Sequence, residues 1–389
     1  MINTPFQCVL LKDVVYFQEG PGLRNWQYGN TGIPFLNIRT INDNGFIDKD
    51  LCQFVKPEEF YGKYEHFLLN AGDYVVSSSG TLGKLAEIRE EDLPLMLNTS
   101  VIRFRPVDIN ILDRIYLKWF VKSPLYIRQV QKVSTGTAIK NYGPSHLKKM
   151  LIPLPPIEEQ RRIAAILDQA DAIRRKRQEA IRLTEELLRA TFLDMFGDLA
   201  STSWKLSTVE NVASDHKGSM RTGPFGSQLL HSEFVDEGIA VLGIDNAVHN
   251  YFSWGKPRFI TQEKFNKLKR YTVYPGDVII TIMGTCGRCA IVPENCPAAI
   301  NTKHLCCITL DHGKCLPEFL HSYFLLHPKA HQYLEKNVKG AIMDGLNMGI
   351  IKKLPVPLIP ITLQQKYRQI YQNIHQIKHK NFLSTGQKA

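Results

Sequence analysis

The hydrophobic pattern of the chain contains two long stretches with helical spacing. The first runs from Ile157 to about Gly197 without an internal proline or glycine. At a rise of about 1.5 Å per residue, its roughly 40 residues would span about 60 Å. Its apolar side chains fall on the a and d positions of a heptad repeat or directly beside them: Ile163, Ile166, Ala170, Ile173, Ala180 and Leu187, with Leu167, Ile181 and Leu188. This pattern predicts one long amphipathic helix.

The second stretch lies near the end of the chain and is shorter. Its apolar residues follow one another in steps of four and three: Leu363, Tyr367, Ile370, Ile374 and Ile377. Each helix could pack on its own domain, but a helix of about 60 Å is longer than the diameter of a small domain. We therefore expect the two helices to pair with each other.

The remaining apolar runs are short and mixed. Asp73–Ser77 and Asp277–Thr281 follow a glycine turn and predict strands, as does the alternating segment Val101–Arg105. Segments 111–132 and 315–336 have helical spacing, and each is interrupted by a proline, Pro124 or Pro328. Strands and helices in this order predict an α+β fold.

The sequence contains an internal repeat, in which residues of the first half recur in the second half at positions numbered 204 higher. Adding 204 to Gly72-Asp73 gives Gly276-Asp277, and adding it to Gly80-Thr81 gives Gly284-Thr285. The same offset relates further positions: Gly83 to Gly287, Lys84 to Arg288, Phe120 to Phe324, Pro124 to Pro328, Gly136 to Gly340, Lys148-Lys149 to Lys352-Lys353, Pro153-Leu154 to Pro357-Leu358, and Gln160 to Gln364. Glycine and proline fix special backbone geometry, so the two halves should share one fold.

Composition and charge narrow the partner class. The 389 residues carry a formal net charge of +11, with 44% hydrophobic and 22% charged residues, which is ordinary for a globular protein apart from the basic excess. That excess favours a polyanionic partner. The first residues, MINTPFQCVL, lack a secretory pattern, and no apolar run is long enough to cross a bilayer, so a cytoplasmic protein is expected.

The candidate catalytic and metal-binding motifs do not match the patterns that those functions require. Gly80-Thr-Leu-Gly83-Lys84-Leu85 has leucine where a phosphate loop needs Ser or Thr. Cys286 and Cys289 form a CxxC, but the matching positions of the first half are Leu82 and Leu85, which favours buried thiols over zinc. We find no hydrolase, dinucleotide or adenine-methyltransferase motif, and expect no catalytic residue, metal or cofactor.

Four features together resemble the specificity subunit of type I restriction–modification systems. They are the strand–turn pair Gly72–Gly83 and Gly276–Gly287, the later glycine turns at 134–138 and 338–342, the proline stop at 147–156 followed by Ile157-Glu-Glu-Gln160, and the tandem order of both halves. The second copy departs from the pattern at Lys339-Gly-Ala341, which lacks the threonines of the first. Its last helix is also short, with 28 residues after Ile361.

The resemblance implies an architecture and a set of partners. Two target recognition domains, at 1–153 and 201–357, would each read one part of a split double-stranded DNA sequence. The helices at 154–200 and 358–389 would pair as an antiparallel coiled coil that acts as a spacer. Methyltransferase subunits using S-adenosylmethionine and ATP-driven restriction subunits would assemble on this scaffold, and none of their cofactors would bind this chain.

Candidate DNA contacts are polar, basic and aromatic residues on loops. They come from the Gly-rich loop at 19–28, its counterpart at 220–228, and the later turns: Arg24, Asn25, Trp26, Gln27, Tyr28, Thr81, Lys84, Lys140, Asn141, Tyr142, Arg221, Gln228, Thr285 and Arg288. The competing interpretation is structural, with the loop glycines forming turns and Trp26 belonging to the core.

Three alternatives stay open at this level. The chain could be a coiled-coil adaptor with two protein-binding heads, or a nuclease whose site carries no familiar motif. The basic run Arg174-Arg-Lys-Arg177 on the long helix could contact DNA, although a solvated helix face is the simpler interpretation.

Overall fold

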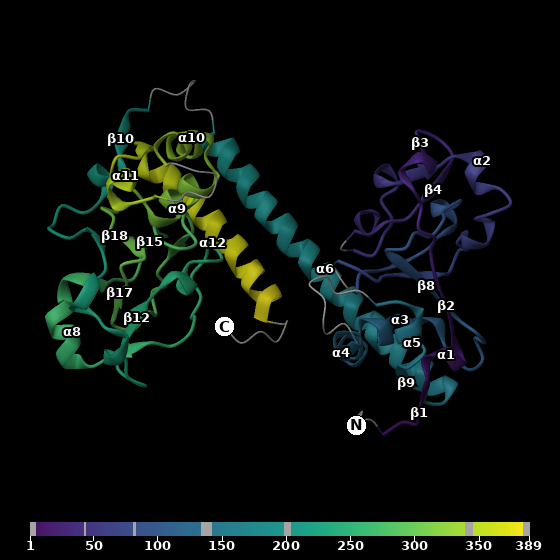
Figure 1. The fold of residues 1–389 in the computed structure, drawn as a ribbon. Coiled ribbons are helices and arrows are strands. Elements are labelled where there is room, and N and C mark those ends of the chain that lie inside the picture. Colours follow the sequence, from purple (N-terminus) through teal and green to yellow (C-terminus); the bar gives the residue numbers. More distant parts are fainter. Residues whose placement is uncertain are drawn as a thin grey trace. The chain divides into compact units, whose positions relative to one another are not determined.

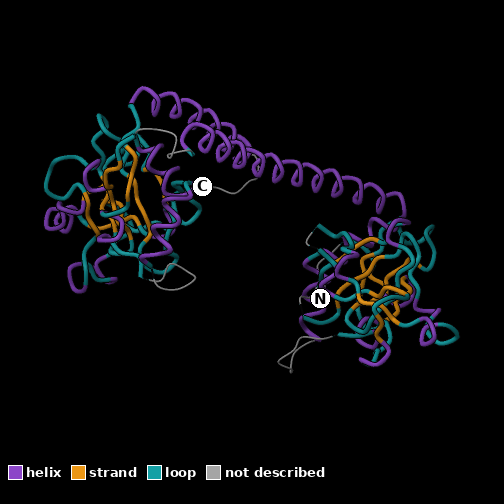
Figure 2. The backbone as a smooth tube through the Cα atoms, turned by 90° about the horizontal axis from the view of Figure 1, so that it is seen from above, coloured by secondary structure: helices purple, strands orange, loops and turns teal. Residues whose placement is uncertain are grey.

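The computed structural model describes residues 5–42, 44–80, 83–133, 142–197, 204–338 and 345–383. The chain forms two compact units, Met1–Ile173 and Arg174–Ala389, and helix α6 (Ile157–Phe196) contributes residues to both. Figure 1 follows the chain through them, and Figure 2 shows the strands in the interior of each unit with helices and loops around them. The division into four domains inferred from the sequence stays a prediction.

Before α6, the first unit contains these helices and strands: β1 (Cys8–Leu10), α1 (Leu11–Val14), β2 (Val15–Glu19), β3 (Tyr28–Gly29), β4 (Ile33–Phe35), β5 (Gln53–Val55), α2 (Pro57–Phe60), β6 (Tyr74–Ser77), β7 (Leu85–Glu87), β8 (Val101–Pro106), α3 (Arg114–Lys122), α4 (Pro124–Val133), α5 (Pro144–Leu147) and β9 (Leu151–Pro153).

After α6, the second unit contains these: β10 (Leu206–Thr208), α7 (Val209–Val212), β11 (Met220–Thr222), β12 (Ile239–Leu242), β13 (Phe259–Ile260), α8 (Gln262–Leu268), β14 (Thr272–Val273), β15 (Val278–Thr281), β16 (Cys289–Ile291), β17 (Ala299–Asn301), β18 (Leu305–Ile308), α9 (Pro317–Leu326), α10 (Pro328–Asn337), α11 (Met348–Lys352), β19 (Pro355–Pro357) and α12 (Ile361–Leu383).

The two units share the strand order of their central sheet and the pairing of their first and last strands, as the repeat predicts. The central antiparallel sheet has the order β2-β8-β6-β7 in the first unit and β11-β18-β15-β16 in the second. In each unit the first strand pairs with the last, β1 with β9 and β10 with β19. The predicted α+β fold class is confirmed.

A second sheet differs in extent between the units. In the second unit it has four strands in the order β13-β12-β17-β14, with Val241 beside Ile300 and Thr272 beside Ile300. In the first unit the matching pairs are isolated bridges from Met96 to Phe35 and to Leu68. Met96 in the first unit and Ile300 in the second therefore occupy matching positions, and each pairs with a residue on either side.

The predicted interruption of the helices by proline is confirmed. Pro124 and Pro328 are the first residues of α4 and α10, where a missing N–H costs no helical hydrogen bond. Asp113 caps α3 by accepting a hydrogen bond from the Tyr116 N–H at 2.8 Å. Each predicted helical segment is therefore two shorter helices.

The pairing of the two long helices is confirmed for the C-terminal part of α6, as Figures 1 and 2 show. The ring of Tyr367 lies 5.3 Å from that of Phe192 and 5.5 Å from that of Phe196, measured between centroids. Lys378 forms an ion pair with Glu185. Residue numbers rise along α12 as they fall along α6, so the helices are antiparallel.

The predicted apolar seam of α6 is covered over only part of its length. Ile166 is 53% exposed and Ile173 46% exposed. Length accounts for these two residues, because α12 has 23 residues and α6 has 40. Leu187 is also 56% exposed although its neighbour Glu185 pairs with Lys378 of α12, so the seam is incompletely covered in the paired part as well. Arg174, Arg175 and Lys176 are exposed on this helix, and Arg174 donates to the side-chain oxygen of Gln178 at 2.9 Å.

A buried glutamine fixes the start of each long helix. The amide of Gln160 is fully buried, accepts from the Asp113 N–H at 2.9 Å, and donates to the carbonyls of Ile111 and Pro155. Gln364 repeats this arrangement with the Leu316 N–H and the carbonyls of Lys314 and Ile359. The repeated glutamine of the sequence is thus a structural clamp between the helix and the loop before α3 or α9.

We expect the substitution Gln364→Ala to lower the free energy of unfolding by about 2 kcal/mol. It leaves one buried N–H and two carbonyls without their partner, and each unsatisfied buried group costs roughly 1–3 kcal/mol. Denaturant unfolding measures the change. The control is Gln365→Ala, because Gln365 is the exposed neighbour on the same helix; equal effects of the two substitutions would contradict the clamp.

The repeated aspartate is buried in both units but neutralised from different strands. Asp73 is 1% exposed and accepts from Arg105 at 2.6 and 2.9 Å. Asp277 is also 1% exposed and pairs with Arg221 on β11. The residue that corresponds to Arg105 of β8 in the second unit is Thr309. The aspartate is therefore present in both units, but its arginine partner lies on β8 in the first unit and on β11, the neighbour of β18, in the second.

Candidate nucleic-acid interface

Three loops of the first unit meet where β6 ends. Ser78 donates from its backbone to the Ser100 carbonyl at 3.0 Å and from its hydroxyl to the Thr99 carbonyl at 3.3 Å. A side chain at Gly20 would lie 2.4 Å from the Asn98 backbone, so the loop at 19–28 approaches the same point closely. The Tyr142 N–H bonds the Ser78 carbonyl, which brings in the segment after α4.

The second unit builds the same junction at the end of β15. The Ile282 N–H donates to the His304 carbonyl at 2.8 Å, and the Gly223 N–H to the Thr302 carbonyl at 3.3 Å. A side chain at Gly223 would lie 2.0 Å from the Asn301 carbonyl oxygen, so only glycine allows this approach. The loops predicted to read DNA are therefore gathered at one edge of the central sheet in each unit.

The turn after β6 and β15 has the same frame in both units. Gly80 and Gly284 have φ values of 64° and 71°, a conformation that favours glycine. The turn is closed by the last strand residue: the Ser77 hydroxyl accepts from the Lys84 N–H at 3.0 Å, and the Thr281 hydroxyl from the Arg288 N–H at 2.9 Å. The ends of the turn are therefore held through the main-chain N–H groups of Lys84 and Arg288, without their side chains.

The Gly-rich loops also share a frame, a short 3₁₀ turn closed by glutamine. The Gln27 side-chain oxygen accepts from the Arg24 N–H at 2.9 Å, and that of Gln228 from the Phe225 N–H at 3.3 Å. A tyrosine from a distant segment holds each glutamine. The Gln27 amide donates to the Tyr64 hydroxyl, and the Tyr271 hydroxyl donates to Gln228.

These shared frames present different side chains. At the tip of the first loop, Arg24 and Asn25 are exposed and Trp26 is 59% exposed. At the matching tip of the second loop stand Phe225, which is 49% exposed, and the exposed Gly226 and Ser227. The structural interpretation of Trp26 as a core residue is therefore wrong. Thr285 and Arg288 are exposed on the turn of the second unit.

Three candidate residues are corrected because their side chains are buried and bonded within the protein. Gln27 is 2% exposed and closes its loop as described. Tyr142 is 2% exposed, and its hydroxyl donates to the Ser77 carbonyl at 3.1 Å, while burial raises its pKa to about 12. Arg221 is 7% exposed and pairs with Asp277. These residues support the loops and are not available for DNA contact.

The other candidate residues differ in exposure. Lys84 is half-buried and donates to the Ile41 carbonyl at 3.1 Å, and Tyr28 is half-buried with its ring 5.3 Å from that of Phe35. Gln228 is exposed, although its oxygen is used by the loop. Thr81, Lys140 and Asn141 lie outside the described residues. The exposed candidates that remain are Arg24, Asn25, Trp26, Gln228, Thr285 and Arg288.

Sequence reasoning missed the segment that connects these loops. Asn98-Thr99 and Asn301-Thr302 are its matching parts, but they differ by 203 and so fall one residue outside the constant offset. In the second unit Lys303 and His304 follow, both half-buried. Burial and then the positive charges of Lys303 and Arg258 lower the pKa of His304.

Five of the eight cysteines are buried, whereas Cys8, Cys286 and Cys296 are half-buried. Cys289, Cys306, Cys307 and Cys315 are at most 1% exposed, and burial raises the pKa of each of these thiols. Among the residues that the structure describes, no group of three or more His, Cys, Asp or Glu side chains is placed to hold a metal ion. None of the described helices is both long and apolar enough to cross a membrane.

Comparison with known proteins identifies the family. The model of the type I restriction modification DNA specificity domain matches residues 3–183 and 235–385. The EcoBI specificity subunit of Escherichia coli is 23% identical over 92% of this chain and 77% of its own length. The MjaVIII specificity subunit of Methanocaldococcus jannaschii is 23% identical over 68% of this chain and 63% of its own length.

A solved structure shows the same fold. The S subunit of the type I restriction–modification system from M. genitalium superposes with a TM-score of 0.60 at 16% sequence identity, and the match covers 99% of this chain and 95% of that one. The two repeated units, their shared loop frames and the match of the family over both halves agree: this chain belongs to the type I restriction–modification DNA specificity family.

Proposed function

We propose that this chain reads a split DNA target for a type I restriction–modification complex and does no chemistry itself. Each unit reads one half of the target through the loops at the end of β6 or β15. Double-stranded DNA is the ligand, and the methyltransferase and restriction subunits that act on it are the partners. The paired helices α6 and α12 serve as the scaffold and spacer.

One observation carries this proposal: the Gly-rich loops of the two units have the same backbone turn but different exposed side chains at its tip. The 3₁₀ turns closed by Gln27 and Gln228 hold Arg-Asn-Trp in one unit and Phe-Gly-Ser in the other. Base edges in the major groove are distinguished by the side chains that face them, while the approach is set by the backbone. A duplicated frame with different tips therefore fits a protein that reads two different half-sites.

We expect an exchange of residues 1–150 for the equivalent half of a relative to change only one half of the methylated sequence. The physical reason is that each unit has its own sheets, core and loop junction, so its readout does not depend on the other unit. The exchanged gene is expressed with its methyltransferase partner, and methylated positions are mapped over the host genome.

A finer exchange localises the effect. Replacing only Arg24-Asn-Trp26 by the tip of the same relative should alter the same half-site, while an exchange confined to exposed residues of α4 should alter neither. A change in both half-sites, or in neither after the large exchange, would show that the units do not read DNA separately.

A further inference from the structure

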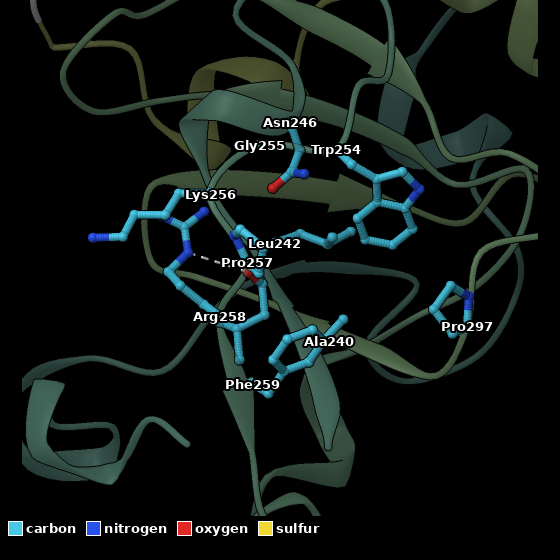
Figure 3. A pocket seen from close by; sticks show the side chains of 11 residues that line it. Ala240, Leu242, Asn246, Trp254, Gly255, Lys256, Pro257, Arg258, Phe259 and Pro297 are labelled. Atoms are coloured by element: carbon cyan, nitrogen blue, oxygen red, sulfur yellow. Dashed lines mark hydrogen bonds between the residues drawn. The ribbon is translucent and has the colours of Figure 1, made fainter. Parts of the chain in front are cut away.

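A pocket of about 280 Å³ lies beside the loop junction of the second unit. Its lining is mostly apolar and comes from the end of β12, from the segment leading into β13, and from Pro297. Figure 3 shows the indole of Trp254 and the ring of Pro297 on one flank, Arg258 on the other, and the Lys256 side chain extending outward, away from the indole.

The carboxylate of Asp245, which is not itself in the lining, holds the lining segment 255–258 in place. One oxygen pairs with Arg258, and the other accepts from the Lys256 N–H at 2.9 Å. A side chain at Gly255 would lie 2.0 Å from that second oxygen, so the segment passes over the carboxylate only with glycine there. The ring of Phe252 meets the Trp254 indole edge to face at 5.1 Å, which fixes the indole although it is 44% exposed.

The pocket belongs to the same edge of the unit as the candidate interface. Leu242, in its lining, accepts through its carbonyl from the Thr302 N–H at 2.9 Å. Ile244 lies 2.9 Å from the place that a side chain on Gly284 would take, so this segment borders the turn that carries Thr285 and Arg288. The pocket and this turn are therefore neighbours in the second unit.

The chemistry of the lining favours one flat ring with an anionic attachment. An apolar cavity of about 150 Å³ already holds benzene, so this volume admits a one-ring or a two-ring base. Base–aromatic stacking is a sequence-tolerant attraction, and Trp254 supplies the surface for it. Among the described residues the Lys256 ammonium forms no hydrogen bond or ion pair, and its side chain is exposed, which suits a phosphate.

We propose that this pocket receives one unstacked nucleobase of the bound DNA, with Trp254 stacking on it and Lys256 contacting its phosphate. The inference rests on the proposed function, since it needs DNA at this edge. A base that stays in the duplex offers only its edge to a protein, so a pocket of this shape would be filled only by a base that has left the stack.

The first unit has different residues at the matching place. Strands β4 and β5 pair as β12 and β13 do, with Ile33 beside Val55 where Ile239 lies beside Ile260. By this register, Gln53 stands for Arg258 and Leu51 for Lys256. The cation–aromatic combination therefore belongs to the second unit, as expected for an element that serves one half-site.

The test uses the full chain and two duplexes of about 30 base pairs that differ in one feature. In one duplex the fluorescent adenine analogue 2-aminopurine is an unpaired, bulged nucleotide, and in the other it is paired with thymine. We expect about tenfold tighter binding of the bulged duplex, as one base–aromatic stack would give, together with quenching of the 2-aminopurine fluorescence by the indole.

Four variants separate stacking from structure. Trp254→Ala should abolish the preference and the quenching, and Trp254→Phe should retain part of both. Lys256→Ala should weaken binding of the bulged duplex more than that of the paired duplex, because only the unstacked nucleotide brings its phosphate to Lys256, and the quenching by Trp254 should remain. Tyr61→Ala is the matched control: it removes a 63% exposed aromatic ring that is not part of the loop junction, and it should leave the preference unchanged.

The outcomes distinguish this inference from the proposed function. Salt-dependent binding of both duplexes without preference, or a preference that survives Trp254→Ala, overturns the pocket proposal and leaves the function intact. Failure to bind either duplex overturns the function and the pocket proposal together. A preference lost in Trp254→Ala and kept in Tyr61→Ala supports the pocket proposal.

Discussion

Replacing Arg221 by methionine should lower the free energy of unfolding of this protein by about 3–5 kcal/mol. The Arg221 side chain is 7% exposed and that of Asp277 is 1% exposed, so the substitution leaves a carboxylate buried without its cation. Arg221 also donates to the Thr272 carbonyl at 2.8 Å and to the Thr309 hydroxyl at 3.0 Å, and these acceptors lose their donor. Denaturant unfolding, followed by circular dichroism, measures the loss.

The first unit and a second substitution provide controls. Arg105→Met should cost less, because the Arg105 side chain is 40% exposed and Arg103 remains 3.5 Å from the Asp73 carboxylate. Adding Asp277→Asn to Arg221→Met removes the buried charge and should recover part of the stability. An effect of Arg221→Met below about 1 kcal/mol would contradict a buried ion pair of this kind.

The same substitution separates support from contact at the DNA-reading edge. Arg221 was a candidate DNA contact on sequence grounds, and the structure places it in the interior. Below the unfolding transition, the folded Arg221→Met protein should therefore bind DNA with the salt dependence of the unaltered chain. A smaller salt dependence in the folded variant would return Arg221 to the interface.

The part of the fold between Gly72 and the long helices could be predicted because its features are local. A glycine or proline that sets a turn or starts a helix does so in both copies, so Pro124 and Pro328 gave the helix starts directly. The long helix was predicted from Ile157 to about Gly197 and runs from Ile157 to Phe196, since an uninterrupted heptad pattern leaves little choice.

The first seventy residues of each copy could not be aligned by a constant offset. The matched positions differ by 198 at Cys8 and Leu206, by 203 at Gly20 and Gly223, and by 206 at Gly32 and Gly238. Insertions and deletions in loops cause these shifts. The pairing of β1 with β9 also joins Cys8 to Pro153, a contact that no short-range pattern reveals.

The candidate site was predicted at the level of loops and less well at the level of side chains. Trp26 and Gln27 are neighbours in the same Gly-rich loop, yet the first is exposed and the second buried. The partners that bury Gln27, Glu59 and Tyr64, are 32 and 37 residues away. Polar residues on a loop therefore look alike in the sequence until the long-range partners are known.

The largest expected effect on binding is that of salt. With a net charge of +11 and about six phosphates engaged, the affinity for duplex DNA should fall roughly a thousandfold between about 50 and 200 mM salt. Each neutralised phosphate releases a condensed counterion, so the slope of the logarithm of affinity against the logarithm of salt counts the contacts. Fluorescence anisotropy of a labelled duplex over this range measures the slope.

Arg24 and Arg288 are the cations that we expect to contribute to this slope. Each turn is held by the main-chain N–H of its arginine, which bonds Gln27 or Thr281, so removal of the side chain leaves the frame in place. Arg24→Ala or Arg288→Ala should weaken binding and reduce the slope by about one, as loss of one phosphate contact does, without a change in the unfolding midpoint.

Lys314→Ala is the matched control for Arg288→Ala. Lys314 is a 48% exposed cation beyond the C-terminal end of β18, and β18 runs antiparallel to β15, so Lys314 lies at the opposite end of the sheet from the Arg288 turn. Its removal should leave the slope unchanged. If Lys314→Ala lowers the slope as much as Arg288→Ala, the protein attracts DNA through its total charge and the loop junction is not the contact surface. A flat salt response of the unaltered chain would instead contradict DNA binding itself, because no protein can neutralise phosphates without releasing their counterions.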